Sequence, residues 1–164
     1  MKLRIFTTGG TIDKIYFDAK SRFEVGEPTV GMVLQEAQVG FDYEITELLK
    51  KDSLEIEAAD RVLIKQAVEA CEESLVLITH GTDTMTETAE YLAGIAGKTV
   101  VLTGALTPAR FRSTDAIFNI GSAVAAVQTR AAGVYIAMNG RVFAAGKVRK
   151  NRELNRFEPL AVED

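Results

Sequence analysis

The sequence predicts an α/β fold in which a doubly wound, mostly parallel sheet is flanked by helices. Short β-forming runs alternate with stretches whose apolar residues recur at helical spacing, an order typical of βαβ units. The continuous apolar run at 75–79 indicates a strand buried on both faces. Asn139-Gly140, between two β-like runs, predicts a β-hairpin toward the C-terminus. The 164 residues fit one domain, and no linker or repeat divides 1–164.

The expected elements follow one another in alternating order. Strands are predicted at 2–7, 43–48, 75–79, 99–103 and 134–138, with an antiparallel return at 141–145. Helices are predicted around 30–37, over 57–72, from 84 to about 93 and over 115–129. The polar stretch 8–28 is long for a loop, and loops of this length are usually functional or mobile. The stretch 146–164 is charged and has no clear period.

Two of these helices carry more specific signals. Thr84, with Glu87 three residues later, fits a capping box at the start of the third helix. This assignment leaves the preceding Thr82 and Asp83 without a structural task. In the fourth helix, the apolar spacing predicts a core-facing stripe formed by Ile117, Ile120, Val124 and Val127.

Composition excludes several kinds of site and partner. The net charge of −4 provides no basic surface, so we expect no nucleic-acid partner. The single cysteine, Cys71, excludes an internal disulfide, and its helical spacing with Ile64 and Val68 predicts a packing role. The single histidine, His80, excludes a multi-histidine metal site, and we expect neither metal nor cofactor. No apolar run has membrane-spanning length and no signal peptide is recognised, which predicts a cytoplasmic protein.

Two hydroxyl-bearing turns follow predicted strands. Thr8-Gly9-Gly10-Thr11 comes after the strand at 2–7, and His80-Gly81-Thr82-Asp83 comes after the strand at 75–79. The carboxyl ends of parallel strands meet at one edge of the sheet, where α/β proteins bind ligands, so we expect a single site. The nucleotide-binding patterns G-x-G-x-x-G and G-x-x-x-x-G-K-[ST] and the serine hydrolase pattern G-x-S-x-G are absent.

A threonine nucleophile is the chemistry that these turns fit. A free hydroxyl is a weak nucleophile and needs an adjacent base. The neighbours of His80 indicate a supporting residue at a strand end rather than that base. The remaining candidates are a tyrosine, a carboxylate acting through water, or a lysine whose proton can pass to a partner. Thr82-Asp83 supplies a hydroxyl beside a carboxylate, and backbone amides of the glycine turns could hold an oxyanion.

The two turns together resemble the paired signature of the bacterial-type L-asparaginase family. The similarity continues through Val101-Leu102-Thr103-Gly104-Ala105, Phe118-Asn119 and Val134-Tyr135-Ile136-Ala137-Met138-Asn139. The resemblance implies the family's larger N-terminal α/β domain, a homo-oligomer, and hydrolysis of L-asparagine to L-aspartate and ammonia. Family members also carry a smaller C-terminal domain that completes the site of a neighbouring subunit. We expect that domain to be absent from this chain.

The resemblance also implies roles for individual residues. Thr11 matches the family's first catalytic threonine, the nucleophile, and Thr82 with Asp83 matches the second threonine and its aspartate. Lys150 falls at the catalytic lysine, which gives a Thr82–Lys150–Asp83 relay. The segment containing Ser53 resembles the family's substrate-holding serine segment. We therefore expect Ser53, Thr82 and Asp83 to contact the substrate.

One departure from the family leaves alternatives open. Phe23 stands where the family has a loop tyrosine, and it has no hydroxyl to relay a proton. Either Tyr16, at a different offset on the same stretch, replaces that tyrosine, or catalysis is impaired. One alternative is therefore a regulatory domain that binds aspartate or asparagine without turnover. Another is the amidase part of an assembly that amidates charged tRNA. The sequence leaves open whether asparagine, glutamine or another amide is the substrate.

Overall fold

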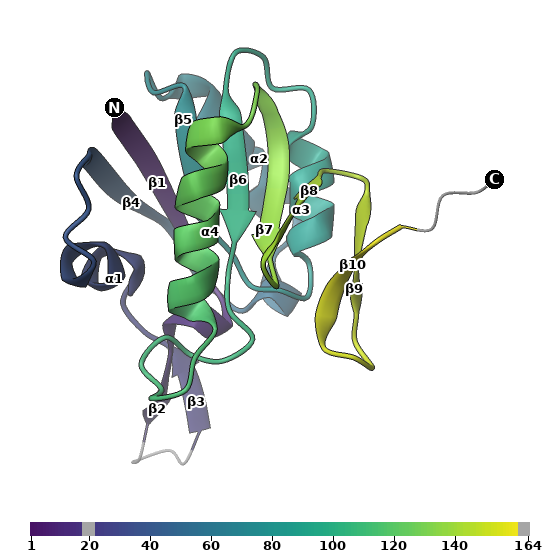
Figure 1. Cartoon of the computed structure of the whole chain (residues 1–164). Coiled ribbons are helices and arrows are strands. Elements are labelled where there is room, and N and C mark those ends of the chain that lie inside the picture. The colour runs from purple at the N-terminus through teal and green to yellow at the C-terminus, as the bar shows by residue number, and fades with distance from the viewer. Residues whose placement is uncertain (18–21, 161–164) are drawn as a thin grey trace.

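The computed structural model, which describes residues 1–17 and 22–160, has the doubly wound α/β architecture that the sequence predicts (Figure 1). Its main sheet has six strands in the order β4-β1-β5-β6-β7-β8. Five of them are parallel: β4 (Asp42–Lys51), β1 (Lys2–Gly9), β5 (Leu75–Thr79), β6 (Thr99–Thr103) and β7 (Gly133–Met138). The sixth, β8 (Arg141–Ala144), pairs antiparallel with β7.

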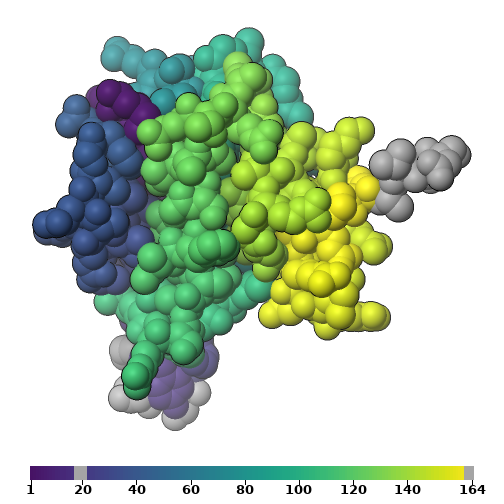
Figure 2. Space-filling view, in the orientation of Figure 1, coloured from purple at the N-terminus to yellow at the C-terminus, as the bar shows by residue number. Residues whose placement is uncertain are grey.

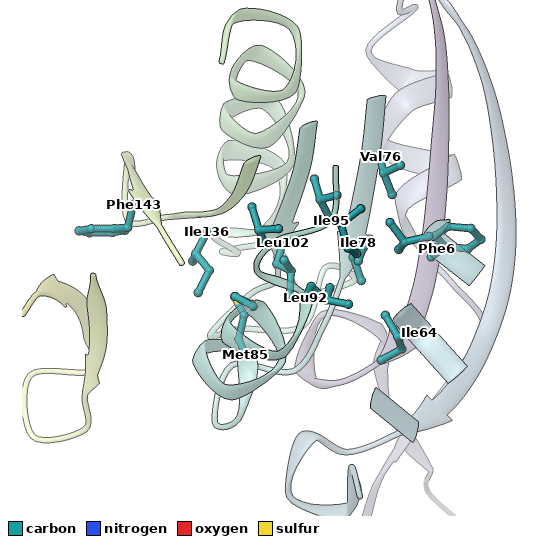
Figure 3. Close-up of a cluster of buried hydrophobic side chains, with 14 of the residues drawn as sticks. Phe6, Ile64, Val76, Ile78, Met85, Leu92, Ile95, Leu102, Ile136 and Phe143 are labelled. Atoms are coloured by element: carbon teal, nitrogen blue, oxygen red, sulfur yellow. The ribbon is translucent and has the colours of Figure 1, made fainter. Parts of the chain in front are cut away.

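Helices cover both faces of this sheet. On one face lie α1 (Val30–Glu36) and α4 (Ala116–Thr129), and on the other lie α2 (Ala58–Ala70) and α3 (Met85–Leu92). Because side chains alternate along a strand, each face has its own apolar core. Figure 3 shows the core under α2 and α3, where Ile78 and Leu102 from the sheet meet Met85 from α3. No helix among the described residues is long and apolar enough to cross a bilayer.

The hairpin predicted at Asn139-Gly140 is confirmed. Asn139 has φ 52° and Gly140 has φ 72°, so both residues adopt the left-handed conformation that a tight two-residue turn requires. The chain then returns as β8, with Met138 paired to Arg141. This connection places the segment after β8 beside α3 and next to the carboxyl edge of the sheet (Figure 1).

The two stretches without clear period contain a second and a third hairpin. The stretch 8–28 contains a 3₁₀ turn (Thr11–Asp13) followed by β2 (Lys14–Phe17) and β3 (Arg22–Val25). The C-terminal stretch contains β9 (Val148–Asn151) and β10 (Arg156–Pro159), which pair only with each other among the described strands. In Figure 2, β9 and β10 (yellow) form a separate mass beside the main body. Residues 18–21 and 161–164 lie outside the described part of the chain.

Two expectations about helices are wrong in detail. Ile117 is 56% exposed, because the buried face of α4 is rotated by one residue and begins at Ala116. Small alanines on that face allow α4 to pack close to the sheet. Thr84 does precede α3, but its hydroxyl makes no capping bond and instead donates to the carbonyl oxygen of Ser53, 2.7 Å away. Cys71 is half-buried against the α2 and α3 core, as its predicted packing role requires.

Candidate functional site

The two hydroxyl-bearing turns lie in direct contact at the carboxyl edge of the sheet. β1 and β5 are parallel neighbours, and Thr7 is paired with Thr79 at the point where both strands end. A Cβ atom added to Gly10 would lie 2.4 Å from the Cα of Gly81, so these positions accept only glycine. The Thr8 hydroxyl also donates to the carbonyl of Thr79 at 3.0 Å. The single site predicted from the sequence order is therefore geometrically possible.

The structure brings Thr82, Asp83 and Lys150 together. The Nζ of Lys150 lies 2.8 Å from Thr82 Oγ1 and 2.8 Å from Asp83 Oδ1, and it can donate to both. Thr82 is buried, and the side chain of Lys150 is only 11% exposed. Lys150 reaches this position from β9, so the hairpin that the sequence analysis missed supplies the amine. Arg152 on the same hairpin lies 3.9 Å from Asp83 Oδ1.

Ser53 lies against the same turn. It begins a short 3₁₀ turn (Ser53–Glu55) after β4, and Asp52 and Glu55 cap that turn reciprocally. The buried Ser53 Oγ accepts a hydrogen bond from the backbone N–H of Asp83 at 3.2 Å. The serine hydroxyl keeps its own proton for donation to a ligand. A Cβ on Gly81 would lie 2.5 Å from that of Ser53, which shows how closely the two segments pack.

Thr11 is not hydrogen-bonded to the other three residues. It begins the 3₁₀ turn after Gly10 and is half-buried. Within residues 1–17 and 22–160, no hydrogen bond joins its hydroxyl to Thr82 or Lys150. Its closeness to the Thr82 turn comes from the backbone contact between Gly10 and Gly81.

Tyr16 and Phe23 face each other across the β2–β3 hairpin. They are direct cross-strand partners, and their ring centroids lie 5.4 Å apart in an edge-to-face arrangement. Residues directly opposite in an antiparallel pair share one face, so the Tyr16 hydroxyl projects from the same side as the Phe23 ring. Phe111, from the loop after β6, packs against Phe23 at 5.9 Å and was not identified from the sequence.

Asp13 is a further residue that sequence reasoning missed. Its buried carboxylate accepts hydrogen bonds from the backbone N–H of Thr29 at 2.8 Å and from the Thr29 hydroxyl at 2.7 Å. Its backbone carbonyl accepts from the N–H of Gly26 at 2.7 Å. Burial raises the pKa of Asp13, against the lowering effect of the two bonds from Thr29. These contacts close the base of the β2–β3 hairpin directly after Thr11.

His80 is completely buried behind the second turn. Its Nδ1 lies 2.7 Å from the carbonyl oxygen of Gly81, and its Nε2 lies 2.9 Å from the Thr88 hydroxyl. Burial lowers the pKa of His80 to about 4, so the ring is neutral at pH 7. A buried, neutral ring agrees with the predicted supporting position at the end of β5.

Two hollows flank the Thr82–Asp83–Lys150 cluster. One, of about 420 Å³, lies between the β2–β3 hairpin and the Asp52–Glu55 segment, and Phe23 lines it. The other, of about 390 Å³, follows β9 and is lined by Lys150 and Arg152. A larger hollow of about 530 Å³ near Arg141 and Phe157 contains no predicted site residue. Among the described residues, no group of three or more His, Cys, Asp or Glu side chains is arranged to bind a metal.

Comparison with known proteins identifies one family. The sequence model described as "Asparaginase, N-terminal" matches residues 2–158. The L-asparaginase of Thermococcus kodakarensis is 32% identical over 178 aligned positions, which cover 100% of this chain and 52% of that protein. A glutaminase-asparaginase of Acinetobacter glutaminasificans is 44% identical over 80 residues, 46% of this chain and 24% of that protein.

Solved structures of the same kind share the fold. The thermostable L-asparaginase from Thermococcus kodakarensis superposes with a TM-score of 0.83 at 28% identity, over 100% of this chain and 52% of that one. A probable cytoplasmic L-asparaginase from Campylobacter jejuni gives a TM-score of 0.84 at 29% identity, over 96% and 53% of the two chains. The chain thus spans about half the length of these relatives.

Proposed function

The chain belongs to the asparaginase family, matching its N-terminal sequence model over residues 2–158, and from this we propose that it hydrolyses the side-chain amide of L-asparagine or a similar substrate. The products are a carboxylate and ammonia. The observation that carries the proposal is the position of Lys150 Nζ, 2.8 Å from both Thr82 Oγ1 and Asp83 Oδ1. A buried hydroxyl held by an amine and a carboxylate is an arrangement that moves protons rather than one that stabilises a fold.

Thr11 is the nucleophile in this proposal. Its Oγ attacks the amide carbon, and its proton passes through Thr82 to Lys150, which must be the amine at that moment. The Asp83 carboxylate holds Lys150 in place and stabilises the positive charge that it gains. The negative charge on the substrate oxygen is stabilised by backbone N–H groups of the glycine turns.

The same relay completes the reaction. The proton returns through Thr82 to the leaving nitrogen, which departs as ammonia and leaves an ester on Thr11. Water then attacks the ester carbon, gives its proton to the relay, and releases the carboxylate product while the Thr11 hydroxyl is restored. In this scheme the Ser53 hydroxyl donates to a charged group of the substrate, at the position that its bond from the Asp83 amide fixes.

The test is ammonia release from L-asparagine and L-glutamine, measured with a coupled assay. We expect turnover by the wild type and a loss of about 10²–10⁴-fold in kcat for Thr11→Ala, Thr82→Val and Lys150→Met. Thr129→Ala is the matched control, because Thr129 is exposed at the far end of α4. Circular dichroism of each variant verifies that the fold persists.

Two results would contradict the proposal. Equal turnover in the wild type and in the three site variants would exclude these residues. Calorimetric binding of aspartate without any ammonia release would instead support the regulatory alternative. For the homologous enzymes the printed names are L-asparaginase and glutaminase-asparaginase, and these names favour turnover.

We also propose that the protein acts in the cytoplasm as a homo-oligomer. The exposed Ile117 and Phe118 on α4 offer apolar surface for contact between copies, with 56% and 63% of each residue accessible. Light scattering after size-exclusion chromatography measures the subunit number, and a monomer at micromolar concentration would contradict the oligomer.

A further inference from the structure

The buried imidazole of His80 connects the second hydroxyl-bearing turn to two helices. Nδ1 contacts the Gly81 carbonyl at 2.7 Å, and Nε2 contacts the hydroxyl of Thr88 on α3 at 2.9 Å. That hydroxyl in turn lies 3.3 Å from Nε of Arg61 on α2. Arg61 is itself held by an ion pair with Glu87 at 2.9 Å. The chain of contacts runs from the helix layer to the turn that carries Thr82.

The direction of each hydrogen bond in this chain follows from chemistry. A carbonyl oxygen only accepts, so Nδ1 of His80 carries the proton and donates to Gly81. In a neutral ring the other nitrogen, Nε2, is then an acceptor and receives the Thr88 proton. The Thr88 oxygen keeps a lone pair that accepts from Arg61 Nε. Every donor in the series therefore points toward the turn, and only one tautomer of His80 satisfies it.

This chain fixes the orientation of the peptide between Gly81 and Thr82. No cis peptide occurs in the described residues, and in a trans peptide the C=O and N–H point in opposite directions. Since the Gly81 carbonyl turns inward to His80, the Thr82 N–H turns away from it. Thr82 is 5% exposed, yet within residues 1–17 and 22–160 its backbone N–H has no acceptor. A buried N–H without a partner is rare and is available to a ligand oxygen.

We propose that His80 is a positioning residue that holds the Gly81 carbonyl inward and thereby orients the Thr82 N–H toward the substrate oxygen on which negative charge develops. The inference rests on the proposed amide hydrolysis. Gly81 has no side chain to restrain its peptide, so the imidazole supplies the restraint. Because the N–H interaction strengthens as charge builds up, its loss affects the chemical step more than substrate binding.

Two substitutions at His80 separate this role from simple packing. The amide nitrogen of asparagine superposes on Nδ1 of histidine, so His80→Asn keeps a donor to Gly81. The amide of glutamine superposes on Nε2, so His80→Gln keeps the contact with Thr88 but loses that donor. We expect His80→Gln to lower kcat about 10²-fold with KM changed less than about twofold, and His80→Asn to recover a large part of that loss. Equal kcat in the two variants, or an effect on KM alone, would overturn the inference.

The Thr88 pair provides a second comparison. Thr88→Val removes the hydroxyl at nearly constant volume, whereas Thr88→Ser retains it. We expect kcat to fall in the valine variant and to be largely retained in the serine variant. A valine variant with unchanged kcat would contradict the chain of hydrogen bonds from Arg61 to Gly81.

A spectroscopic test is independent of turnover. Because His80 is the only histidine, ¹⁵N-histidine labelling gives the NMR signals of this one ring. The expected state at pH 7 is neutral with the proton on Nδ1, and addition of L-aspartate should shift the Thr82 amide proton. A proton on Nε2, or a charged ring, would overturn the inference whatever the activity. Absence of ammonia release from every amide would contradict the proposed function, while the tautomer would still decide the role of His80.

Discussion

Among single residues, His80 has the ionisation that folding changes most clearly. Its pKa is lowered from 6.5 to about 4 by burial, so between these pH values the unfolded chain binds a proton that the folded chain does not. The sign follows directly: the free energy of unfolding is highest above pH 6.5 and decreases as the pH falls toward 4. The loss from this group is about 3 kcal/mol in total. Urea unfolding of wild type and His80→Asn between pH 4 and 7.5 measures it. A constant difference between the two proteins across that range would contradict the prediction.

Two buried threonine hydroxyls give a prediction of the opposite kind. Thr7 and Thr79 are paired across β1 and β5, and neither hydroxyl has a hydrogen-bond partner among the described residues. Thr7→Val replaces that hydroxyl by a methyl group of similar size, which removes a desolvated polar group. We expect the free energy of unfolding to stay unchanged or rise by up to about 1 kcal/mol in urea titrations.

Thr103→Val is the matched control for that substitution. Thr103 lies in the same row of the sheet, but its hydroxyl donates to the carbonyl of Ala137 at 2.8 Å. Loss of this bond leaves a buried carbonyl with one acceptor site unused and costs about 1–2 kcal/mol. If Thr7→Val proves as destabilising as Thr103→Val, the Thr7 hydroxyl has a bound partner such as an internal water.

At this scale, the sequence allows prediction of which residues are near one another only where a motif fixes their positions. Thr82 and Asp83 are adjacent in the chain, and the resemblance alone pointed to Lys150, which the structure indeed places against them. The contact between Asp13 and Thr29, and that between His80 and Thr88, have no sequence signal. Each depends on where two separate segments pack in three dimensions.

At the scale of elements, the close contact between the two turns depends on glycine. Gly10 has φ 89°, and a Cβ there would lie 2.4 Å from backbone atoms that cannot move without shifting the Gly81 turn. We expect Gly10→Ala to lower the free energy of unfolding by more than about 2 kcal/mol and to abolish ammonia release. Thermal unfolding and the coupled assay measure the two effects.

The matched control is the same substitution on α4. Gly121 lies in the middle of that helix, and nothing lies within 4 Å of the position of an added Cβ. Gly121→Ala should therefore raise the free energy of unfolding by about 0.5–1 kcal/mol, since alanine favours the helix. If both alanine variants changed stability in the same direction, steric contact at Gly10 would not explain the result.

The elements themselves were predictable in proportion to their burial. The strands at 75–79 and 99–103 are predicted with their observed bounds, because a strand buried on both faces is a continuous apolar run. The β2–β3 and β9–β10 hairpins were missed, since four-residue strands that pair with one neighbour carry mixed polar side chains. In α4, spacing alone could not distinguish a face containing Ile117 from one containing Ala116.

At the scale of the whole molecule, the six-stranded sheet supplies the Thr82 turn, whereas a separate hairpin supplies Lys150. β9 and β10 pair only with each other within the described chain, so no strand hydrogen bonds connect them to the main sheet. They are attached through Val148 and Phe157, which are buried in the core under α2 and α3, and through a bond from Phe157 N–H to Asn139 Oδ1. The position of the amine therefore depends on side-chain docking.

This division predicts unequal stability across the molecule. Amides of β9 and β10 should exchange with solvent faster than those of β5 and β6, since hairpins held by few buried contacts open locally. Phe157→Leu should weaken the docking by roughly 2 kcal/mol, through the loss of about three carbon atoms from a buried side chain. We expect faster exchange confined to the hairpin and a lower kcat, because Lys150 then spends less time beside Thr82. Native-state hydrogen exchange and the ammonia assay measure the two effects.

The control for that variant is Phe143→Leu. Phe143 is buried in the same core, but it lies on β8, which is paired to the main sheet and carries no proposed site residue. Its substitution should cost a similar free energy of unfolding while leaving hairpin exchange and kcat close to the wild type. If the two variants instead lowered kcat equally, the loss would follow global stability and not the docking of the hairpin. Uniform exchange across β5, β6, β9 and β10 would likewise mean that the amine and the hydroxyl turn belong to one cooperative unit.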